Sequence, residues 1–141
     1  MKKILFLLIL LSIGCSKDGE SNKSNILNPP EWLHGTWQQD TEYEALNNLI
    51  KVEATQDNVK LYLIGGLGVL DIAGQVRNME SAPNGSVNIE ETTISEETYE
   101  FTMEVFLESA LVQSITYRFE RYEGYKIMFY QNSSGIELFK I

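Results

Sequence analysis

Apolar and polar residues alternate along most of the chain between residues 58 and 131. The clearest run is Thr98–Val105, in which apolar side chains at every second position are separated by Thr or Glu. Because successive side chains of a β-strand point to opposite faces of a sheet, this alternation predicts half-buried antiparallel strands. About eight to ten strands are expected, near residues 35–40, 49–55, 58–64, 67–76, 86–94, 97–108, 110–122, 124–131 and 135–141.

Short turn-forming segments divide these runs. The strongest is Pro83-Asn84-Gly85-Ser86, because Asn-Gly accepts the positive φ angles of a tight hairpin. No long helical stretch separates consecutive strands, which disfavours a parallel sheet. The sequence therefore predicts an all-β fold, a small antiparallel up-and-down barrel, since closing a sheet of this many strands removes its exposed edges.

Two stretches depart from the alternation. Apolar residues recur at helical spacing within Thr41–Ile50, which favours a short helical turn there, with a continuing strand as the alternative. The cluster Gly65-Gly66-Leu67-Gly68 lacks the Lys-Ser/Thr pair and the following helix of a phosphate-binding loop. We expect this cluster to form a bend or bulge between strands.

The N-terminus follows another pattern. Lys2 and Lys3 precede an unbroken apolar run, Ile4–Leu11, and small residues lead from there towards Cys15. This order of positive charge, apolar core and small residues predicts a signal peptide over residues 1–14. The apolar run is shorter than the roughly 20 residues that a transmembrane helix needs.

The junction Ile13-Gly14-Cys15 resembles the lipobox of bacterial lipoproteins, although Ser12 stands where that family usually has Leu. The resemblance implies cleavage before Cys15, acylation of that residue and attachment to a membrane through the lipid. Residues 16–25 contain no apolar side chain, so we expect residues 15–28 to form a flexible, lipidated tether.

The start of this tether, Ser16–Glu20, is similar to acidic signals that send some Gram-negative lipoproteins to the outer face of the outer membrane. A plain solvated linker is the alternative interpretation. We therefore expect an outer-membrane lipoprotein of the cell envelope, in either the periplasmic or the surface-exposed leaflet.

The charge balance excludes some partners. The chain has 11 basic and 20 acidic residues, a net charge of −9, and loss of Lys2 and Lys3 with the signal peptide would make it −11. Nucleic-acid binding requires a surplus of Lys and Arg, and anionic headgroups repel an acidic protein. We expect no nucleic-acid partner, and a membrane attachment that depends on the lipid.

A folded domain is expected over residues 29–141, after the stiff Pro29-Pro30 pair. Its first strand opens with Gly35-Thr36-Trp37, which resembles the Gly-x-Trp signature of lipocalins and of small lipocalin-like domains in bacterial lipoproteins. Gly35 has no side chain and so permits another group to approach the backbone closely. Trp37 is a large apolar residue that could fill one end of a barrel. In lipocalins a cation near the C-terminal end packs over this Trp, and the candidates here are Arg118, Arg121 and Lys140.

The lipocalin resemblance implies a small hydrophobic ligand. The domain is shorter than a typical lipocalin and has no disulfide, so a barrel with a cavity and a barrel filled by its own side chains both stay open. The many aromatic residues of the strands suit a packed core or a cavity wall. Two functions follow: binding of a small hydrophobic ligand, or a protein-interaction module, such as an assembly subunit or inhibitor, with a filled barrel.

Residues suited to catalysis are scarce. His34 is the single histidine, and we expect an exposed or capping side chain rather than a metal ligand or a base. Glu90-Glu91 and Glu96-Glu97 are adjacent pairs whose members point to opposite faces of a strand, so both pairs are expected to be solvated. With Cys15 acylated, no cysteine nucleophile remains. We expect no enzymatic activity, no cofactor and no metal site.

Overall fold

The computed structural model describes residues 26–40, 50–62 and 68–141. These residues form nine β-strands, one α-helix and one 3₁₀-helix. The strands are β1 (Gly35–Gln38), β2 (Lys51–Ala54), β3 (Val59–Tyr62), β4 (Val69–Asp71), β5 (Gly85–Ile94), β6 (Thr98–Leu107), β7 (Ala110–Glu123), β8 (Lys126–Gln131) and β9 (Ser134–Lys140). The helices are η1 (Glu31–Leu33) and α1 (Ile72–Glu80).

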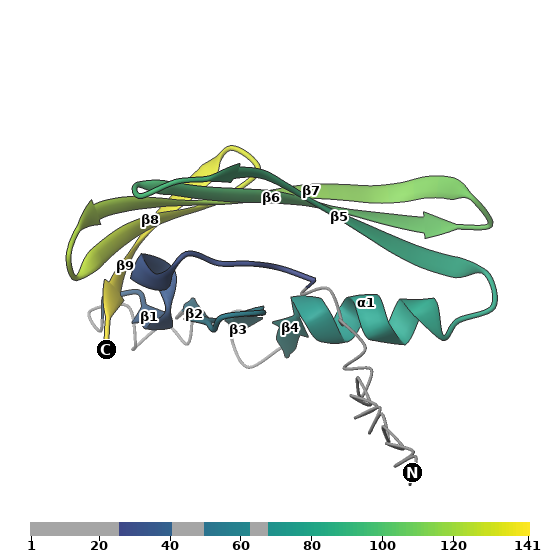
Figure 1. Cartoon of the computed structure of the whole chain (residues 1–141), viewed down its shortest axis with the longest axis horizontal. Coiled ribbons are helices and arrows are strands. Elements are labelled where there is room, and N and C mark those ends of the chain that lie inside the picture. The colour runs from purple at the N-terminus through teal and green to yellow at the C-terminus, as the bar shows by residue number, and fades with distance from the viewer. Residues whose placement is uncertain (1–25, 41–49, 63–67) are drawn as a thin grey trace, which may run out of the picture.

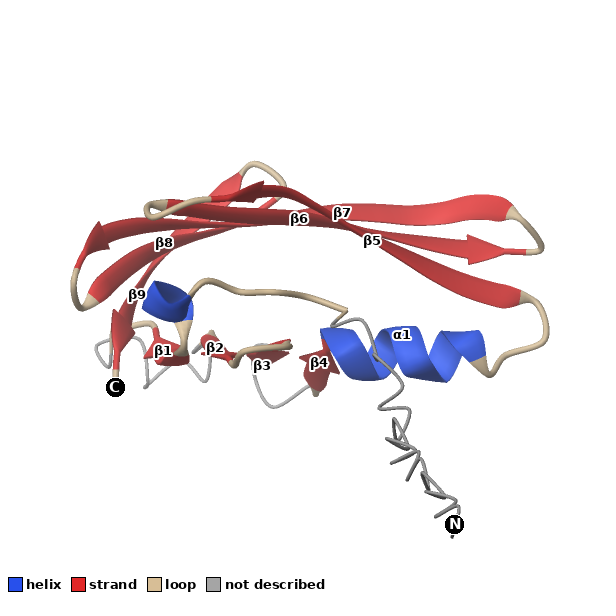
Figure 2. Ribbon diagram, in the orientation of Figure 1, coloured by secondary structure: helices blue, strands red, loops and turns tan. Residues whose placement is uncertain are grey.

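All nine strands belong to one antiparallel sheet in the order β4-β3-β2-β1-β9-β8-β7-β6-β5. Each strand pairs with a neighbour along the chain, and β1 joins the two groups by pairing with β9. The sheet curls into a half-barrel: Figure 2 shows the long strands β5–β8 in one layer and β1–β4 with α1 in the other. The predicted all-β, up-and-down, barrel-like fold is confirmed.

The sequence predicts a strand over 67–76, and most of that prediction is wrong. The strand β4 ends at Asp71, and α1 begins at the next residue. The Oδ1 atom of Asp71 accepts a hydrogen bond from the Gly74 backbone N–H at 2.8 Å, which satisfies a donor that the first helical turn leaves free. The buried residues of α1 recur at helical spacing: Ile72, Ala73 and Val76.

The turn at Pro83-Asn84-Gly85-Ser86 does not close a hairpin, contrary to the sequence prediction. It leads from α1 into β5, which pairs with β6. The strands on either side of the turn, β4 and β5, stand at opposite ends of the strand order. The Asn84 carbonyl accepts a hydrogen bond from the Glu108 backbone N–H at 2.8 Å, so the turn is tied to the β6–β7 connection.

Residues 26–34, here named the N-terminal strap, cross the interior of the curled sheet. Figure 1 shows the strap between the layer of β5–β8 and the layer of β1–β4. Leu27 and Leu33 have no exposed surface, and Asn28 is hydrogen bonded to Glu91 of β5. The folded part therefore includes Leu27 and Asn28, which the sequence pattern places in the tether.

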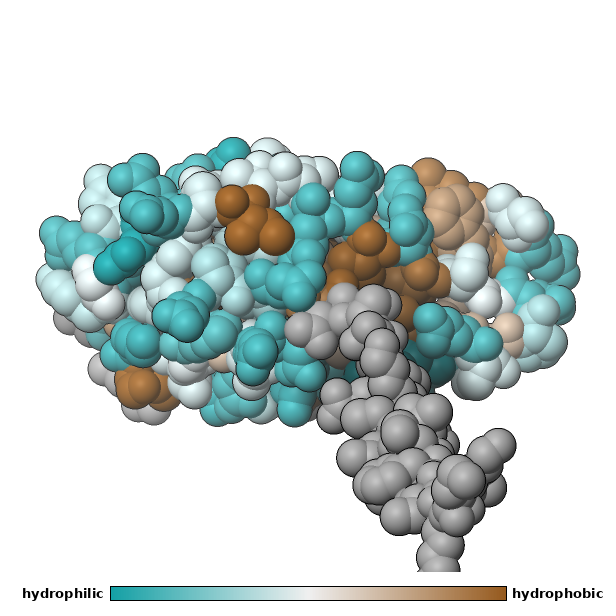
Figure 3. All heavy atoms as spheres, in the orientation of Figure 1, coloured by the Kyte–Doolittle hydropathy of each residue, from teal (hydrophilic) through white to brown (hydrophobic). Residues whose placement is uncertain are grey.

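One hydrophobic core joins both groups of strands, the strap and the first residue of α1. Its strand residues come from alternate positions, as the period-two pattern predicts. Around the core the visible surface is mostly polar; the larger apolar patches lie in the half of the molecule where the β6–β7 layer lies above α1, and smaller ones lie in the other half (Figure 3).

Several sequence predictions fall wholly or mostly outside the described residues. They are the signal peptide over residues 1–14, the acylation of Cys15, the tether up to residue 25, the helical turn within Thr41–Ile50 and the bend at the glycine cluster 65–68. Of that cluster the structure describes Gly68, which directly precedes β4 and has a φ of 138°. This positive φ suits glycine and fits a change of chain direction at this point.

Candidate functional site

The Gly-x-Trp motif lies on β1, which pairs with β2 and β9 in the middle of the strand order. Trp37 is 1% exposed, and its indole N–H donates a hydrogen bond to the Leu33 carbonyl at 2.7 Å. The Lys140 Nζ atom lies 5.3 Å from the centre of the Trp37 ring. Among the three cations considered from the sequence, Lys140 therefore occupies the position over the Trp, because β1 and β9 pair Trp37 with Lys140.

Gly35 holds a conformation that other residues adopt with strain. Its φ is 122°, and a Cβ atom built on it would lie 3.1 Å from Lys140 Cε. Both the positive φ and the close approach of Lys140 favour glycine here. Gly35 and Trp37, which the sequence predicts to close a barrel, thus lie together with Lys140 where β1 pairs with β9.

Glu91 fastens the N-terminal strap to the sheet. Its carboxylate accepts hydrogen bonds from the Asn28 backbone N–H at 2.6 Å and from the Asn28 side-chain amide at 2.9 Å. It also accepts one from the Tyr99 hydroxyl at 2.6 Å. Burial raises the pKa of Tyr99, and the hydrogen bond to Glu91 raises it further.

The prediction of a solvated Glu90-Glu91 pair is therefore wrong for Glu91. Glu90 is exposed, as are both members of the Glu96-Glu97 pair. The two neighbours on β5 differ because Glu91 points towards Tyr99 and the strap. The partner Asn28 is 63 residues away along the chain, so adjacency in sequence carries no sign of this contact.

Two more side-chain bonds involve the strap. The Trp32 indole N–H donates to the Ser95 carbonyl at 2.9 Å, which joins the strap to the end of β5. The His34 Nε2 atom lies 2.9 Å from the Pro29 carbonyl and donates to it. His34 is half-buried and follows η1 directly, so this local bond fits the capping alternative of the sequence prediction and not the exposed one.

Aromatic rings line the inner face of β6, β7 and β8. Phe101 and Tyr117 lie 5.2 Å apart between ring centres, and Tyr117 stacks on Phe129 at 6.4 Å. Tyr117 has no exposed surface, and in the residues that the structure covers its hydroxyl has no hydrogen-bond partner. Burial raises the pKa of Tyr117 to about 12.

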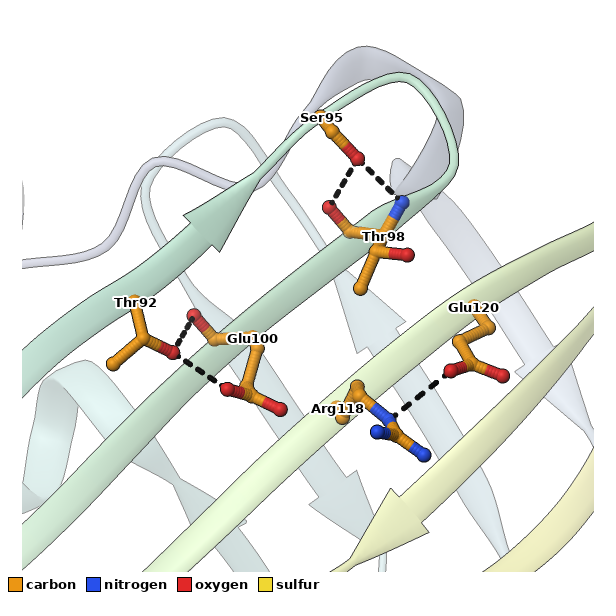
Figure 4. Close-up of polar contacts among 6 residues, drawn as sticks. All are labelled: Thr92, Ser95, Thr98, Glu100, Arg118 and Glu120. Carbon is orange, nitrogen blue, oxygen red and sulfur yellow. Dashed lines mark hydrogen bonds and ion pairs between the residues drawn. The ribbon is translucent and has the colours of Figure 1, made fainter.

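The outer face of β5, β6 and β7 carries a group of polar contacts near the β5–β6 turn. Figure 4 shows Thr92 donating to the Glu100 carboxylate at 2.7 Å and Arg118 paired with Glu120 at 3.2 Å. The Arg118 guanidinium also lies 4.3 Å from the Tyr130 ring centre. In the same view the Ser95 hydroxyl bonds to the Thr98 backbone and closes the β5–β6 turn.

The described residues contain no group of three or more His, Cys, Asp or Glu that could hold a metal ion. Among the helices described, none is both long and apolar enough to cross a membrane. Comparison of the chain with protein-family models, with curated proteins and with solved structures found no match.

Proposed function

We propose that this chain is a lipid-anchored lipoprotein of the cell envelope whose barrel-like domain binds other proteins through its outer surface. The observation that carries the proposal is the strap. Leu27 and Leu33 are fully buried in the same core as Trp37 and the aromatic rings. Since the chain's own residues occupy this part of the interior, the outer surface is the better candidate for recognition.

The anchor rests on the sequence of residues 1–15. We propose cleavage before Cys15, acylation of Cys15 and retention in the outer membrane. Cys15→Ala should abolish incorporation of labelled fatty acid and move the protein from the detergent phase to the aqueous phase in detergent partitioning. Ser12→Leu is the matched control, since it keeps Gly14-Cys15 and should leave labelling intact. Labelling that survives Cys15→Ala would overturn the assignment of the acylated residue.

Protein binding is tested by cross-linking the full-length lipoprotein in intact cells with a short amine- and carboxyl-reactive reagent. The proposal expects a small number of discrete adducts that persist when the reagent is diluted. If the adducts instead cover a continuous range of sizes and change with the reagent concentration, they come from random collisions. That result would contradict specific protein binding.

A second function, binding of a small hydrophobic ligand, is favoured by the hydroxyl of Tyr117. An unpartnered buried hydroxyl costs about 1–3 kcal/mol, and a ligand oxygen beside it would remove that cost. Native mass spectrometry of residues 26–141 distinguishes the two functions. A reproducible additional mass that leaves on denaturation would favour the ligand, and a clean apo mass after exposure to lipids would favour protein binding.

A further inference from the structure

The far end of the β6–β7 hairpin carries apolar side chains that the core does not cover. Leu107, Leu111 and Val112 are 49%, 53% and 53% exposed. Phe106 is the register partner of Leu111, so these two side chains share one face of the sheet. We name Phe106 and Leu111, with Val112 beside Leu111, the hairpin surface; Leu107 directly follows Phe106 and points to the opposite face.

The hairpin surface has a defined shape. Glu108 and Ser109 adopt φ angles of 50° and 68°, the positive values of a tight two-residue turn. The bond from the Glu108 N–H to the Asn84 carbonyl fixes this turn to the beginning of β5. The apolar side chains are therefore presented on a rigid sheet end, where no neighbouring described element buries them.

The charged side chains of the hairpin end itself, Glu104 and Glu108, are acidic. From Asn78 to Tyr117 the chain contains no Lys, Arg or His, and Arg77 in the last turn of α1 directly precedes this stretch. Glu104 precedes Phe106 by two residues on β6 and so shares its face, and Glu108 lies in the turn itself. The first basic side chain on this face is Arg118, which is already paired with Glu120.

This charge decides between the possible occupants. A second copy would bring the same carboxylates against each other, which is destabilising. Anionic headgroups would be repelled in the same way. A cationic segment with apolar side chains would gain both from charge complementarity and from covering Phe106 and Leu111.

We propose that the hairpin surface is a docking site for a basic, apolar-containing segment of a partner protein. The inference rests on the proposed protein-binding function and names the surface and the chemistry of the partner. Leu111 and Phe106 supply the apolar contact, and Glu104 and Glu108 receive the partner's Lys or Arg side chains.

The test uses the mature chain carrying Cys15→Ser and a fluorescent eight-residue peptide of alternating Lys and Leu. Peptides of eight Lys, and of alternating Glu and Leu, are the controls. Fluorescence anisotropy should show binding of the Lys-Leu peptide that weakens as salt rises from about 50 to about 300 mM. Both control peptides should bind at least about tenfold more weakly.

Single substitutions locate the site. Leu111→Asn should weaken binding about tenfold, and Glu104→Gln about two- to fivefold with a smaller salt dependence. The matched controls are Val69→Asn, at an exposed apolar residue of β4, and Glu31→Gln, at an exposed carboxylate of the strap. Both should leave the affinity within twofold, and circular dichroism should show the same fold for all four variants.

Several results would overturn the inference. One is binding of the eight-Lys peptide as tight as that of the Lys-Leu peptide, and another is an unchanged affinity for the Lys-Leu peptide in Leu111→Asn. Self-association of the protein in sedimentation that Leu111→Asn abolishes would point to a second copy as the occupant. Binding to zwitterionic vesicles that requires Leu111 would point to a membrane. If the cross-linked adducts in cells persist unchanged in Leu111→Asn, the protein-binding function stands while the hairpin surface is wrong as its site. Loss of these adducts in Leu111→Asn, but not in Val69→Asn, would support both.

Discussion

Glu91 and Glu90 are adjacent on β5 and differ in what they contact. Glu91 accepts three hydrogen bonds, two from Asn28 and one from Tyr99, whereas Glu90 is exposed. Glu91→Ala should lower the free energy of unfolding by about 2 kcal/mol, because it leaves the Tyr99 hydroxyl and the Asn28 donors without their acceptor. Urea denaturation followed by circular dichroism measures the change.

The control for Glu91→Ala is Glu90→Ala, which makes the same substitution one residue earlier on the same strand. As a surface change it should stay within about 0.5 kcal/mol of the unmodified protein. Equal effects of the two substitutions would mean that the observed loss comes from β-strand propensity and not from fastening the strap.

Tyr117 makes the stability of the domain depend on alkaline pH. Burial raises its pKa from 10.0 to about 12. Between these values the unfolded chain releases the proton and the folded chain keeps it, so rising pH favours unfolding by about 1.4 kcal/mol per pH unit. The stability is fully present below pH 10 and is lost as the pH rises towards 12, and urea denaturation between pH 9 and 12 should follow this course.

Tyr117→Phe separates this effect from that of Tyr99, whose pKa is also raised. The substitution removes an unpartnered buried hydroxyl, so at pH 7 it should leave stability unchanged or raise it by about 1 kcal/mol. It should also make the free energy of unfolding fall less steeply between pH 10 and 12, because one titrating hydroxyl is gone. A clear destabilisation at pH 7 would instead indicate that the hydroxyl has a partner, such as an ordered water or a ligand.

Single residues could be predicted where their role depends on nearby sequence or on a known motif. Gly35 and Trp37 were found through Gly-x-Trp, and Lys140 was one of three candidates until the β1–β9 register paired it with Trp37. Glu91 could not be found in this way. Its role depends on Asn28, which lies far away in the sequence and approaches only after the sheet has curled around the strap.

At the scale of elements, the beginning of β1 depends on a glycine. Gly35→Ala places a Cβ at a φ of 122° and 3.1 Å from Lys140 Cε, which should cost about 2 kcal/mol of stability. Gly124→Ala is the control, because Gly124 has no positive φ and no atom lies within 4 Å of the position that its Cβ would take. It should change stability by less than about 0.5 kcal/mol in the same urea experiment, and equal losses would remove the special role of Gly35.

The strands were predictable where one face is more buried than the other, and β6 and β8 in particular show the alternation directly. The helix α1 was missed because its buried residues directly follow the apolar residues of β4. The signal that was available is Asp71, a good N-cap residue, followed by apolar positions at helical spacing. The prediction of a hairpin at Asn84-Gly85 was wrong for a related reason, because a turn sequence does not specify whether a helix or a strand precedes it.

At the scale of the molecule, the connection between β1 and β9 brings the two ends of the folded chain together. The strap, which precedes β1 in the chain, lies in the space between the two layers (Figure 1). Local sequence patterns describe faces of strands and therefore predict that the sheet has an interior. They do not specify which segment fills it, and Ile26–Pro30 contains too few residues to show any periodicity of its own.

The importance of the strap can be measured by truncation. Chains of residues 16–141, 26–141 and 35–141 differ in the tether and in the strap. The first two should have the same free energy of unfolding within about 0.5 kcal/mol. The third loses Leu27 and Leu33, and burying each leucine contributes about 1.5–3 kcal/mol, a large part of the roughly 5–15 kcal/mol that stabilises a typical domain. It should unfold at much lower urea concentration and lose the near-ultraviolet dichroism of Trp37.

Leu27→Ala in the chain of residues 26–141 gives the same information without shortening the strap, and should cost about 2–5 kcal/mol. If residues 35–141 were instead as stable as residues 26–141, the strap would be a peripheral segment and the space that it occupies would be open to a ligand. That result would favour the small-ligand function over protein binding, because the occupied interior is the main reason for placing recognition on the outer surface. A large loss of stability on removing the strap would mean that the domain needs its own N-terminal residues to complete its core.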